Sequence, residues 1–517
     1  MSHIRLDNPD FVPKQRASGL FPVLVLWGLV FVAILVFLWA QGGFGVGSDY
    51  YLIPWSIIAG VAVLAPPAYI FRKSGFDLFH PLIFAVWSYI FPAFVLGGFI
   101  LAFGLSNPFF LSFIENPEFN IPFSLFIVVF GYLSVVLGFY LPSNKYLVKR
   151  MDKIVPDLDW EPQNVWLPGI ALMFIGIGFN ILGFLQGVLG YQRIDETGIF
   201  DGLLFFLTLI YLIGNLLLWL AIFQSKQKTG AYYLVLFLLV IMVPLKMALQ
   251  GNRGSLFSSV LPIAMAFWYS GRRLKWQHSV VFGGVLFLAI SIGIVYGTTF
   301  RMIKGSEARI NAGDYVGQIT ETIDYISRTD TGRLILESST TLFERLENLS
   351  SLAVVVSNYE KLEAYEASYG LKNNIYNDLL TAFIPRFVWP DKPSTSDPRA
   401  YSDLYFSYGD NSFAITPFGD LLRNFGLFGI PLGMMIVGMY LRLIYSLMIE
   451  TEEPRIWKKM AYYPLLTVVS YEAFYATMFP SLLRTGVVLV LCILLITFLT
   501  PVRDLALPLG RVRHVRS

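Results

Sequence analysis

Long apolar segments, separated by shorter polar ones, run along most of this chain. A helix needs about 20 predominantly apolar residues to cross the hydrocarbon core of a bilayer. Segments of this length predict an all-α, polytopic membrane protein with about twelve transmembrane helices. Glu472 and Arg484 interrupt the last two segments. The predicted helices lie near residues 19–40, 51–71, 81–104, 121–141, 166–188, 203–224, 231–249, 255–271, 279–298, 425–447, 461–479 and 481–500.

Basic residues gather in alternate loops between these segments. Cytoplasmic loops of membrane proteins carry an excess of Lys and Arg. The intervening loops 41–50 and 105–120 contain no basic residue, and 189–202 contains only Arg193. The alternation predicts an even number of helices, with both termini cytoplasmic. The basic loops include residues 14–16, 72–73, 145–153, 226–228, 272–275, 455–459 and 503–516.

The predicted topology divides the chain into three regions. Residues 1–298 hold the first nine helices, and residues 425–517 hold the last three with a basic cytoplasmic tail. Between them, residues 299–424 form an external, mostly helical loop domain. Four prolines between Pro385 and Pro398 favour extended or turning backbone there. A helix lying on or near the bundle is predicted by the apolar spacing of Leu342, Leu346, Leu349, Leu352 and Val356.

Composition supports a membrane protein and excludes several other classes. Of the 517 residues, 56% are hydrophobic and only 14% are charged, whereas a soluble chain has about 25% charged residues. The net charge of +3 gives no indication of a nucleic-acid partner. Cys492 is the only cysteine, so an internal disulfide is impossible and the external loop must hold its shape by packing.

Cations at the outer ends of the predicted helices are the strongest chemical signal. A charge at the centre of a membrane helix costs about 2.5–3.5 kcal/mol on insertion scales, and basic residues are disfavoured on the outer side. Several cations near one depth therefore indicate an anionic ligand, and pyrophosphate suits the planar donor fork of Arg. The candidates are Lys246, Arg253, Arg301, Arg423 and Arg484, with Arg386 and Lys392 from the proline-rich loop.

Each of these residues also has a structural explanation. Lys246 and Arg253 can extend to lipid headgroups along their apolar stems. Glu472 and Arg484 can form a structural ion pair, and the charges of the proline-rich loop can be ordinary surface charges. The sequence leaves these alternatives open.

The catalytic base can be argued by elimination. His3, His80, His278 and His514 all fall on the predicted cytoplasmic side, so an external reaction has no histidine to use. The pattern contains no cluster typical of a metal site and no phosphate-binding loop, so we expect neither a metal nor another cofactor. A carboxylate is left, and partial burial favours Glu472 as a base. The candidates are Glu472, Asp420, Asp391 and Asp403.

Several stretches of the chain carry a family resemblance. The loop contains ERLENLS, then IPRFVWPDKP (Ile384 to Pro393) and FGDLLRNFGLFGI (Phe418 to Ile430). GNRG and TFR follow the seventh and ninth predicted helices. Together these stretches resemble the oligosaccharide repeat unit polymerases of bacteria, known as the Wzy or O-antigen polymerase group.

The resemblance implies a membrane-embedded glycosyltransferase of the C type, with a large periplasmic loop over a cavity. It implies a multi-pass protein of the bacterial inner membrane that works in O-antigen, capsule or exopolysaccharide synthesis. Such an enzyme transfers a glycan from undecaprenyl pyrophosphate to the end of another lipid-linked unit, without a metal. The resemblance assigns the phosphate to Arg253, Arg301 and Arg386. It also implies a flippase and a chain-length regulator as partners.

Two other functions fit the same sequence. A secondary transporter or flippase of lipid-linked sugars shares the layout of twelve helices, although its halves are usually related and its polar sites lie at the midplane. Here the long loop follows the ninth helix and the charges gather at one face. An O-antigen ligase, which moves finished glycan onto another acceptor, shares the donor, but the related ligases use an external histidine.

Overall fold

The computed structural model describes residues 49–106, 109–189, 200–225, 228–250, 255–272, 276–305, 312–330, 343–393, 395–409, 412–413, 415–451 and 454–500. Every regular element within these ranges is a helix. Seven helical segments of the described residues are long and apolar enough to cross a membrane, which supports the predicted class of helical membrane protein. They are Leu52–Lys73, Pro81–Ala102, Pro117–Tyr140, Trp166–Leu185, Asp201–Gln224, Thr416–Met448 and Tyr475–Leu499.

The helices of the first half follow the apolar pattern closely. The segment Pro81–Ala102 contains a π-helical stretch, η2. Pro92 lies inside this stretch and lacks the N–H that an α-helical turn would use. The elements are α2 (Leu52–Ser74), α3 (Pro81–Ala85), η2 (Val86–Leu96), α4 (Gly97–Ala102), η3 (Phe109–Phe113), α5 (Pro117–Tyr140), α6 (Ser143–Met151), α7 (Trp166–Leu185), α8 (Asp201–Leu207), α9 (Leu209–Gln224), α10 (Gly230–Gln250), α11 (Ser255–Trp268) and α12 (Trp276–Lys304).

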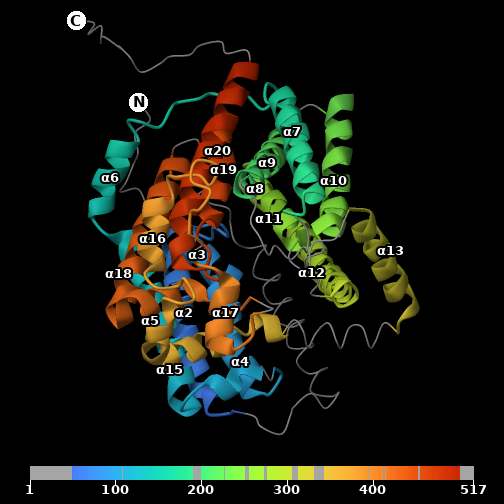
Figure 1. Cartoon of the computed structure of the whole chain (residues 1–517). Helices are drawn as coiled ribbons and strands as arrows, with labels where there is room; N and C mark the ends of the chain where they lie inside the picture. Colours follow the sequence, from blue (N-terminus) through green and yellow to red (C-terminus); the bar gives the residue numbers. More distant parts are fainter. Residues whose placement is uncertain are drawn as a thin grey trace, which may run out of the picture.

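The second half combines short helices with two long ones. Its elements are α13 (Ala312–Arg328), α15 (Leu349–Glu366), α16 (Asn374–Thr381), α17 (Pro398–Phe406), α18 (Thr416–Met448), α19 (Ile456–Thr467), η4 (Tyr475–Thr477) and α20 (Met478–Leu499). Figure 1 shows α15 and α4 at one end of the molecule, while α6 and the last turns of α20 lie toward the other.

The predicted count of twelve is not confirmed, because α10, α11 and α12 occupy three further predicted segments but are not among the seven. One other predicted helix differs from the structure, and another lies outside the described residues. The apolar segment 461–479 is not a single helix, because α19 ends at Thr467 and the backbone to Phe474 is not helical. The polar Glu472 lies within the non-helical stretch, whereas Pro464 stands inside α19, which continues past it to Thr467. The predicted first helix, residues 19–40, falls outside the described ranges.

Helices α5 and α18 form the most extensive helix pair of the described residues. A Cβ atom on Gly138 would lie 2.1 Å from the carbonyl oxygen of Met435, and one on Gly438 would lie 2.1 Å from that of Val135. Small residues let two membrane helices approach so closely that their backbones touch. The glycines therefore fix α18, which carries Asp420 and Arg423, against the bundle.

Two elements of the predicted external region lie deeper than the sequence indicated. Helix α15 begins at Leu349, and all residues from Leu349 to Val356 are buried, so this part penetrates the bundle and does not merely cover it. Helix α18 begins at Thr416, before the predicted tenth helix, and bends at Gly426, whose φ of 66° suits glycine. Asp420 and Arg423 therefore lie on a helical segment before the bend.

Candidate functional site

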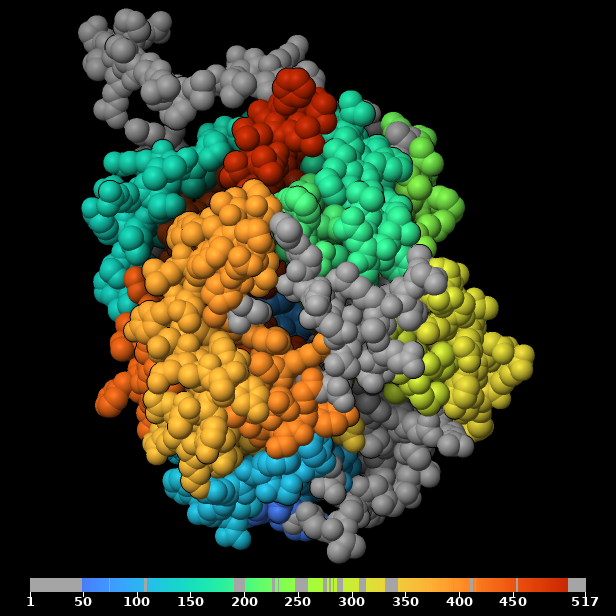
Figure 2. All heavy atoms as spheres, in the orientation of Figure 1, coloured from blue at the N-terminus to red at the C-terminus, as the bar shows by residue number. Residues whose placement is uncertain are grey.

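A cavity of about 480 Å³ brings together three of the predicted cations, Arg386, Lys392 and Arg484. It is enclosed by α8, the end of α16, the proline-rich loop and the first turns of α20. Helix α16 contacts η4 and α20, and α20 contacts α8, which closes the ring of elements. A hollow opens beside orange atoms of the second half of the chain (Figure 2), but blue atoms of the N-terminal part form its floor, and no described residue of that part lines this cavity.

The proline-rich loop holds two of the cations in a compact turn. The amides of Val388 and Trp389 both donate to the carbonyl of Pro385, at 3.0 and 3.1 Å. Lys392 Nζ donates to the carbonyls of Thr381 and Ile384, at 2.6 and 3.2 Å, which ties the loop to the end of α16. Lys392 is thus fixed in place, unlike an ordinary loop charge.

The other basic groups around Lys392 change its proton affinity. Burial lowers the pKa of its ammonium, and neighbouring Arg484 and Arg386 lower it further. Asp378 acts in the opposite direction. Cations that are crowded together repel one another, so an anion that binds between them and neutralises them stabilises the site.

Arg484 enters the cavity from a membrane-spanning helix. Its guanidinium carbon lies 4.6 Å from the ring centroid of Phe206 on α8, a geometry in which the ring face attracts the cation. Its charged neighbours are Asp378 and Arg386. Glu472 interacts instead with Arg345, so the structure does not form the Glu472–Arg484 ion pair that the sequence left open.

Asp378 is a residue of this cavity that the sequence analysis missed. It lies on α16, and its carboxylate accepts hydrogen bonds from the hydroxyls of Thr395 and Ser396, the second at 2.6 Å. The spacing of Asn374 and Asp378 could have indicated this residue, because polar residues four apart share one face of a helix.

Arg423 and Asp420 lie in the protein interior beside this site and do not line the cavity. The side chain of Arg423 is fully buried and contacts Glu366 at 2.8 Å and Asp420 at 3.0 Å. Asp420 also accepts from the amide of Ala476 at 3.0 Å. With these partners inside the protein, the geometry favours a structural role for both and disfavours the predicted pyrophosphate and catalytic roles.

Hydrogen bonds connect this buried group to the cavity. Asn374 Nδ2 donates to Asp420 at 3.0 Å and to the hydroxyl of Ser396 at 2.9 Å. Ser396, in turn, donates to Asp378. Ser396 has a φ of 58°, a strained value for a residue with a side chain, and its hydrogen bonds on both sides stabilise that backbone. We call Arg423, Asp420, Asn374, Ser396 and Asp378 the polar chain.

Lys246 and Arg301 do not line this cavity. Lys246 on α10 stands 5.7 Å from the ring centroid of Tyr211 and lines a separate apolar cavity of about 160 Å³. Arg301 lies in the last turn of α12, and Arg253 falls outside the described residues.

The other carboxylates are also elsewhere. Asp391 is exposed in the turn of the proline-rich loop, and Asp403 is exposed on α17. Glu472 lies in the non-helical segment after α19, where burial among protein groups raises the pKa of its carboxyl and Arg345 opposes that shift. These carboxylates do not line the cavity that holds the three cations.

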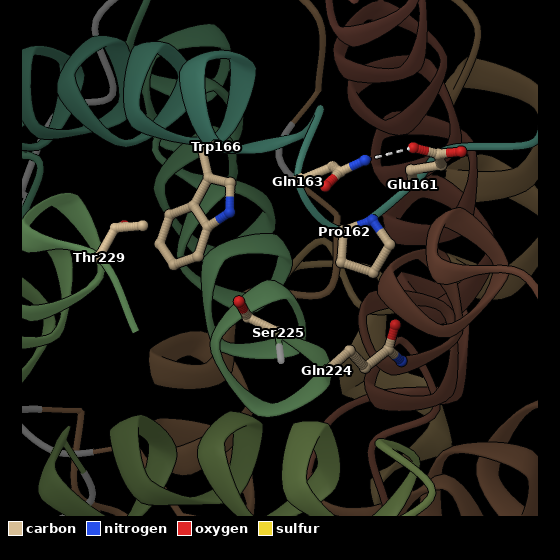
Figure 3. A pocket seen from close by; sticks show the side chains of 7 residues that line it. All are labelled: Glu161, Pro162, Gln163, Trp166, Gln224, Ser225 and Thr229. Carbon is tan, nitrogen blue, oxygen red and sulfur yellow. Dashed lines mark hydrogen bonds between the residues drawn. The ribbon is translucent and has the colours of Figure 1, made fainter. Parts of the chain in front are cut away.

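A second large cavity, of about 510 Å³, lies at the opposite end of the α8–α9 span (Figure 3). Trp166, Gln224, Ser225 and Thr229 face it, together with the segment before α7 in which Gln163 donates to Glu161 at 2.7 Å. None of the described residues that line it is basic. The described part of its lining therefore carries no positive charge, unlike that of the first cavity.

Comparison of the chain with protein families, with curated proteins and with solved structures finds no match. The function has to be inferred from the residues and their geometry.

Proposed function

We propose that this chain is a polymerase of lipid-linked oligosaccharide repeat units, a glycosyltransferase that works without a metal at the outer face of the bacterial inner membrane. It transfers a glycan from undecaprenyl pyrophosphate to the end of another lipid-linked unit. The observation that supports this most is the cavity in which Arg386, Lys392 and Arg484 meet. These cations come from separate elements, a loop and a membrane helix, and converge on one space.

The charge of the cavity suits a pyrophosphate. Three basic side chains face it and one acidic side chain, Asp378, opposes them, so the site keeps an excess of positive charge. Arg binds phosphate oxygens with two parallel N–H donors, and Lys binds as a point charge. The volume lies in the range of small-molecule sites, which is about 300–1,000 Å³.

The apolar part of the cavity suits the lipid. Leu203 and Phe206 of α8 and Val487 and Leu491 of α20 line it next to the cations. Both helices belong to membrane-spanning segments. A polyprenyl chain lying along these side chains would place its pyrophosphate at Arg484, where the apolar surface ends.

The cations also serve the chemistry. In glycan transfer the bond between the anomeric carbon and the pyrophosphate oxygen breaks, and the pyrophosphate takes the electron pair. Negative charge therefore grows on the group that Arg386, Lys392 and Arg484 surround. Donors fixed in place before the reaction stabilise such charge without further reorganisation.

Deletion of the gene distinguishes the polymerase from its alternatives. A polymerase leaves single lipid-linked repeat units at the outer leaflet when it is lost, and the Arg484→Ala variant should fail to restore polymer. Single units held at the inner leaflet would instead indicate a flippase. Polymer of normal length that stays on its lipid carrier and never reaches a further acceptor would indicate a ligase.

A further inference from the structure

Asp378 stands out among the acidic side chains because of where it lies. It is the only acidic residue among the described residues that line the cavity of the three cations. It interacts electrostatically with Lys392 and Arg484. Glu472, Asp420 and Asp391, to which the sequence analysis gave the role of base, do not line this space.

The carboxylate of Asp378 is held in a defined orientation. One oxygen accepts the hydroxyl of Thr395 and the other accepts the hydroxyl of Ser396. Ser396 is itself held by Asn374, which is fixed by the buried Asp420. A functional group held by hydrogen-bonded neighbours that are themselves fixed keeps its geometry during a reaction.

The carboxylate keeps capacity for a further donor. An ionised carboxylate has about four lone-pair sites on its two oxygens, and Asp378 uses two of them on Thr395 and Ser396. Each oxygen can therefore accept one more hydrogen bond. An incoming sugar hydroxyl is the donor that glycan transfer brings to this space.

We infer that Asp378 orients the acceptor hydroxyl and takes its proton during glycan transfer. This inference rests on the proposed polymerase function and assigns the base that the sequence could not. The hydroxyl oxygen forms a bond to the anomeric carbon while the bond from that carbon to the pyrophosphate oxygen breaks. The proton moves to Asp378 and then leaves to water, and the pyrophosphate departs with the electron pair beside Arg386, Lys392 and Arg484.

The effect of Asp378→Asn on donor binding distinguishes a catalytic base from a purely structural carboxylate. The negative charge of Asp378 repels a pyrophosphate, so Asp378→Asn should bind undecaprenyl pyrophosphate as tightly as wild type or more tightly. Loss of a general base lowers the rate by about 10²–10⁴-fold. A purely structural Asp378 would instead lose donor binding and rate together when the turn at Ser396 loosens.

The test compares chain extension and donor binding in proteoliposomes of the full-length protein. We expect Asp378→Asn to extend the glycan at least about 100-fold more slowly, with a dissociation constant for undecaprenyl pyrophosphate equal to or below that of wild type. Asp378→Glu should restore part of the rate. Extension by Asp378→Asn at the wild-type rate, or weakened donor binding in that variant, would overturn the inference.

A second variant covers the case in which Asp378→Asn does not fold. Thr395→Val removes one hydroxyl that holds the carboxylate and keeps the side-chain shape. We expect Thr395→Val to extend the glycan about tenfold more slowly with unchanged donor binding, because only the orientation of the Asp378 carboxylate is lost. If Thr395→Val and Asp378→Asn both extend normally while Arg386→Ala does not, the polymerase stands and Asp378 is excluded. If wild type itself makes no product, both proposals fail.

Discussion

Arg423 and Glu366 form a buried ion pair that joins α18 to α15. Arg423 Nη1 lies 2.8 Å from Glu366 Oε1, and the two side chains are 0% and 5% exposed. Tyr405 donates to the same carboxylate at 3.0 Å, and the guanidinium faces the rings of Tyr401 and Phe474. The pair continues into the polar chain. Arg423 and Asn374 both donate to Asp420, Asn374 also donates to Ser396, and Ser396 donates to Asp378 in the cavity.

Replacing Arg423 should destabilise the protein. Arg423→Ala leaves Glu366 and Asp420 buried without their cation, and removing one partner of a buried ion pair costs about 3–5 kcal/mol. Arg423→Lys should recover only part of that loss, because an ammonium cannot reach both carboxylates with the fork of a guanidinium. The measurement is thermal unfolding of the protein in detergent, with exposed Arg328→Ala on α13 as the matched control.

A stability for Arg423→Ala equal to that of wild type would show that the ion pair does not hold this region. Reduced stability of the Arg328→Ala control would also count against the interpretation, because Arg328 pairs with Asp324 on the surface, where such pairs contribute little.

Enlarging a glycine between α5 and α18 should separate the two helices. Gly438→Ala places a Cβ atom 2.1 Å from the carbonyl oxygen of Val135, and the backbone cannot rotate away as a side chain can. Overpacking of this kind costs about 1–3 kcal/mol. Gly486→Ala on α20 is the control, because its added Cβ meets nothing within 4 Å. Equal melting temperatures for the two variants would contradict the close packing.

Donor binding should depend on the protonation of Lys392. Its pKa is lowered from the ordinary value of 10.5, with burial as the largest cause. The ammonium therefore loses its proton at a lower pH than a free lysine, and binding of undecaprenyl pyrophosphate should weaken as the pH rises through that range. Lys392→Arg keeps its charge to higher pH and should remove this loss. A wild-type dissociation constant that stays constant up to pH 10.5 would contradict a role for Lys392.

Some of the cations that the sequence singled out meet in one cavity, and others do not. Unexpected charge at the outer end of an apolar segment led to Arg484, and the crowding of prolines led to Arg386 and Lys392; the structure brings these three into one cavity. The same rule led to Arg423, which is neutralised inside the protein. Charge placement along a chain does not show which carboxylates will face a cation after folding, and Glu366 is far from Arg423 in sequence.

The apolar pattern predicted most helices because a membrane span depends on local hydrophobicity. It was wrong for 461–479, where the apolar stretch continues through a non-helical break that contains Glu472. It also did not show that α15 penetrates the bundle, since a buried segment and a surface helix share the same apolar spacing. Asp378 was missed because its role depends on Thr395 and Ser396, which folding alone brings to it.

Reconstituted chain extension tests the central claim most directly. Purified protein in liposomes receives a repeat unit linked to undecaprenyl pyrophosphate, with a chelator present, and the glycan length is read as a ladder. The proposed site predicts a ladder from wild type and from Arg328→Ala, and none from Arg386→Ala or Arg484→Ala, although all three variants fold. A normal ladder from the variants that lack Arg386 or Arg484 would contradict the assignment of this cavity to the pyrophosphate.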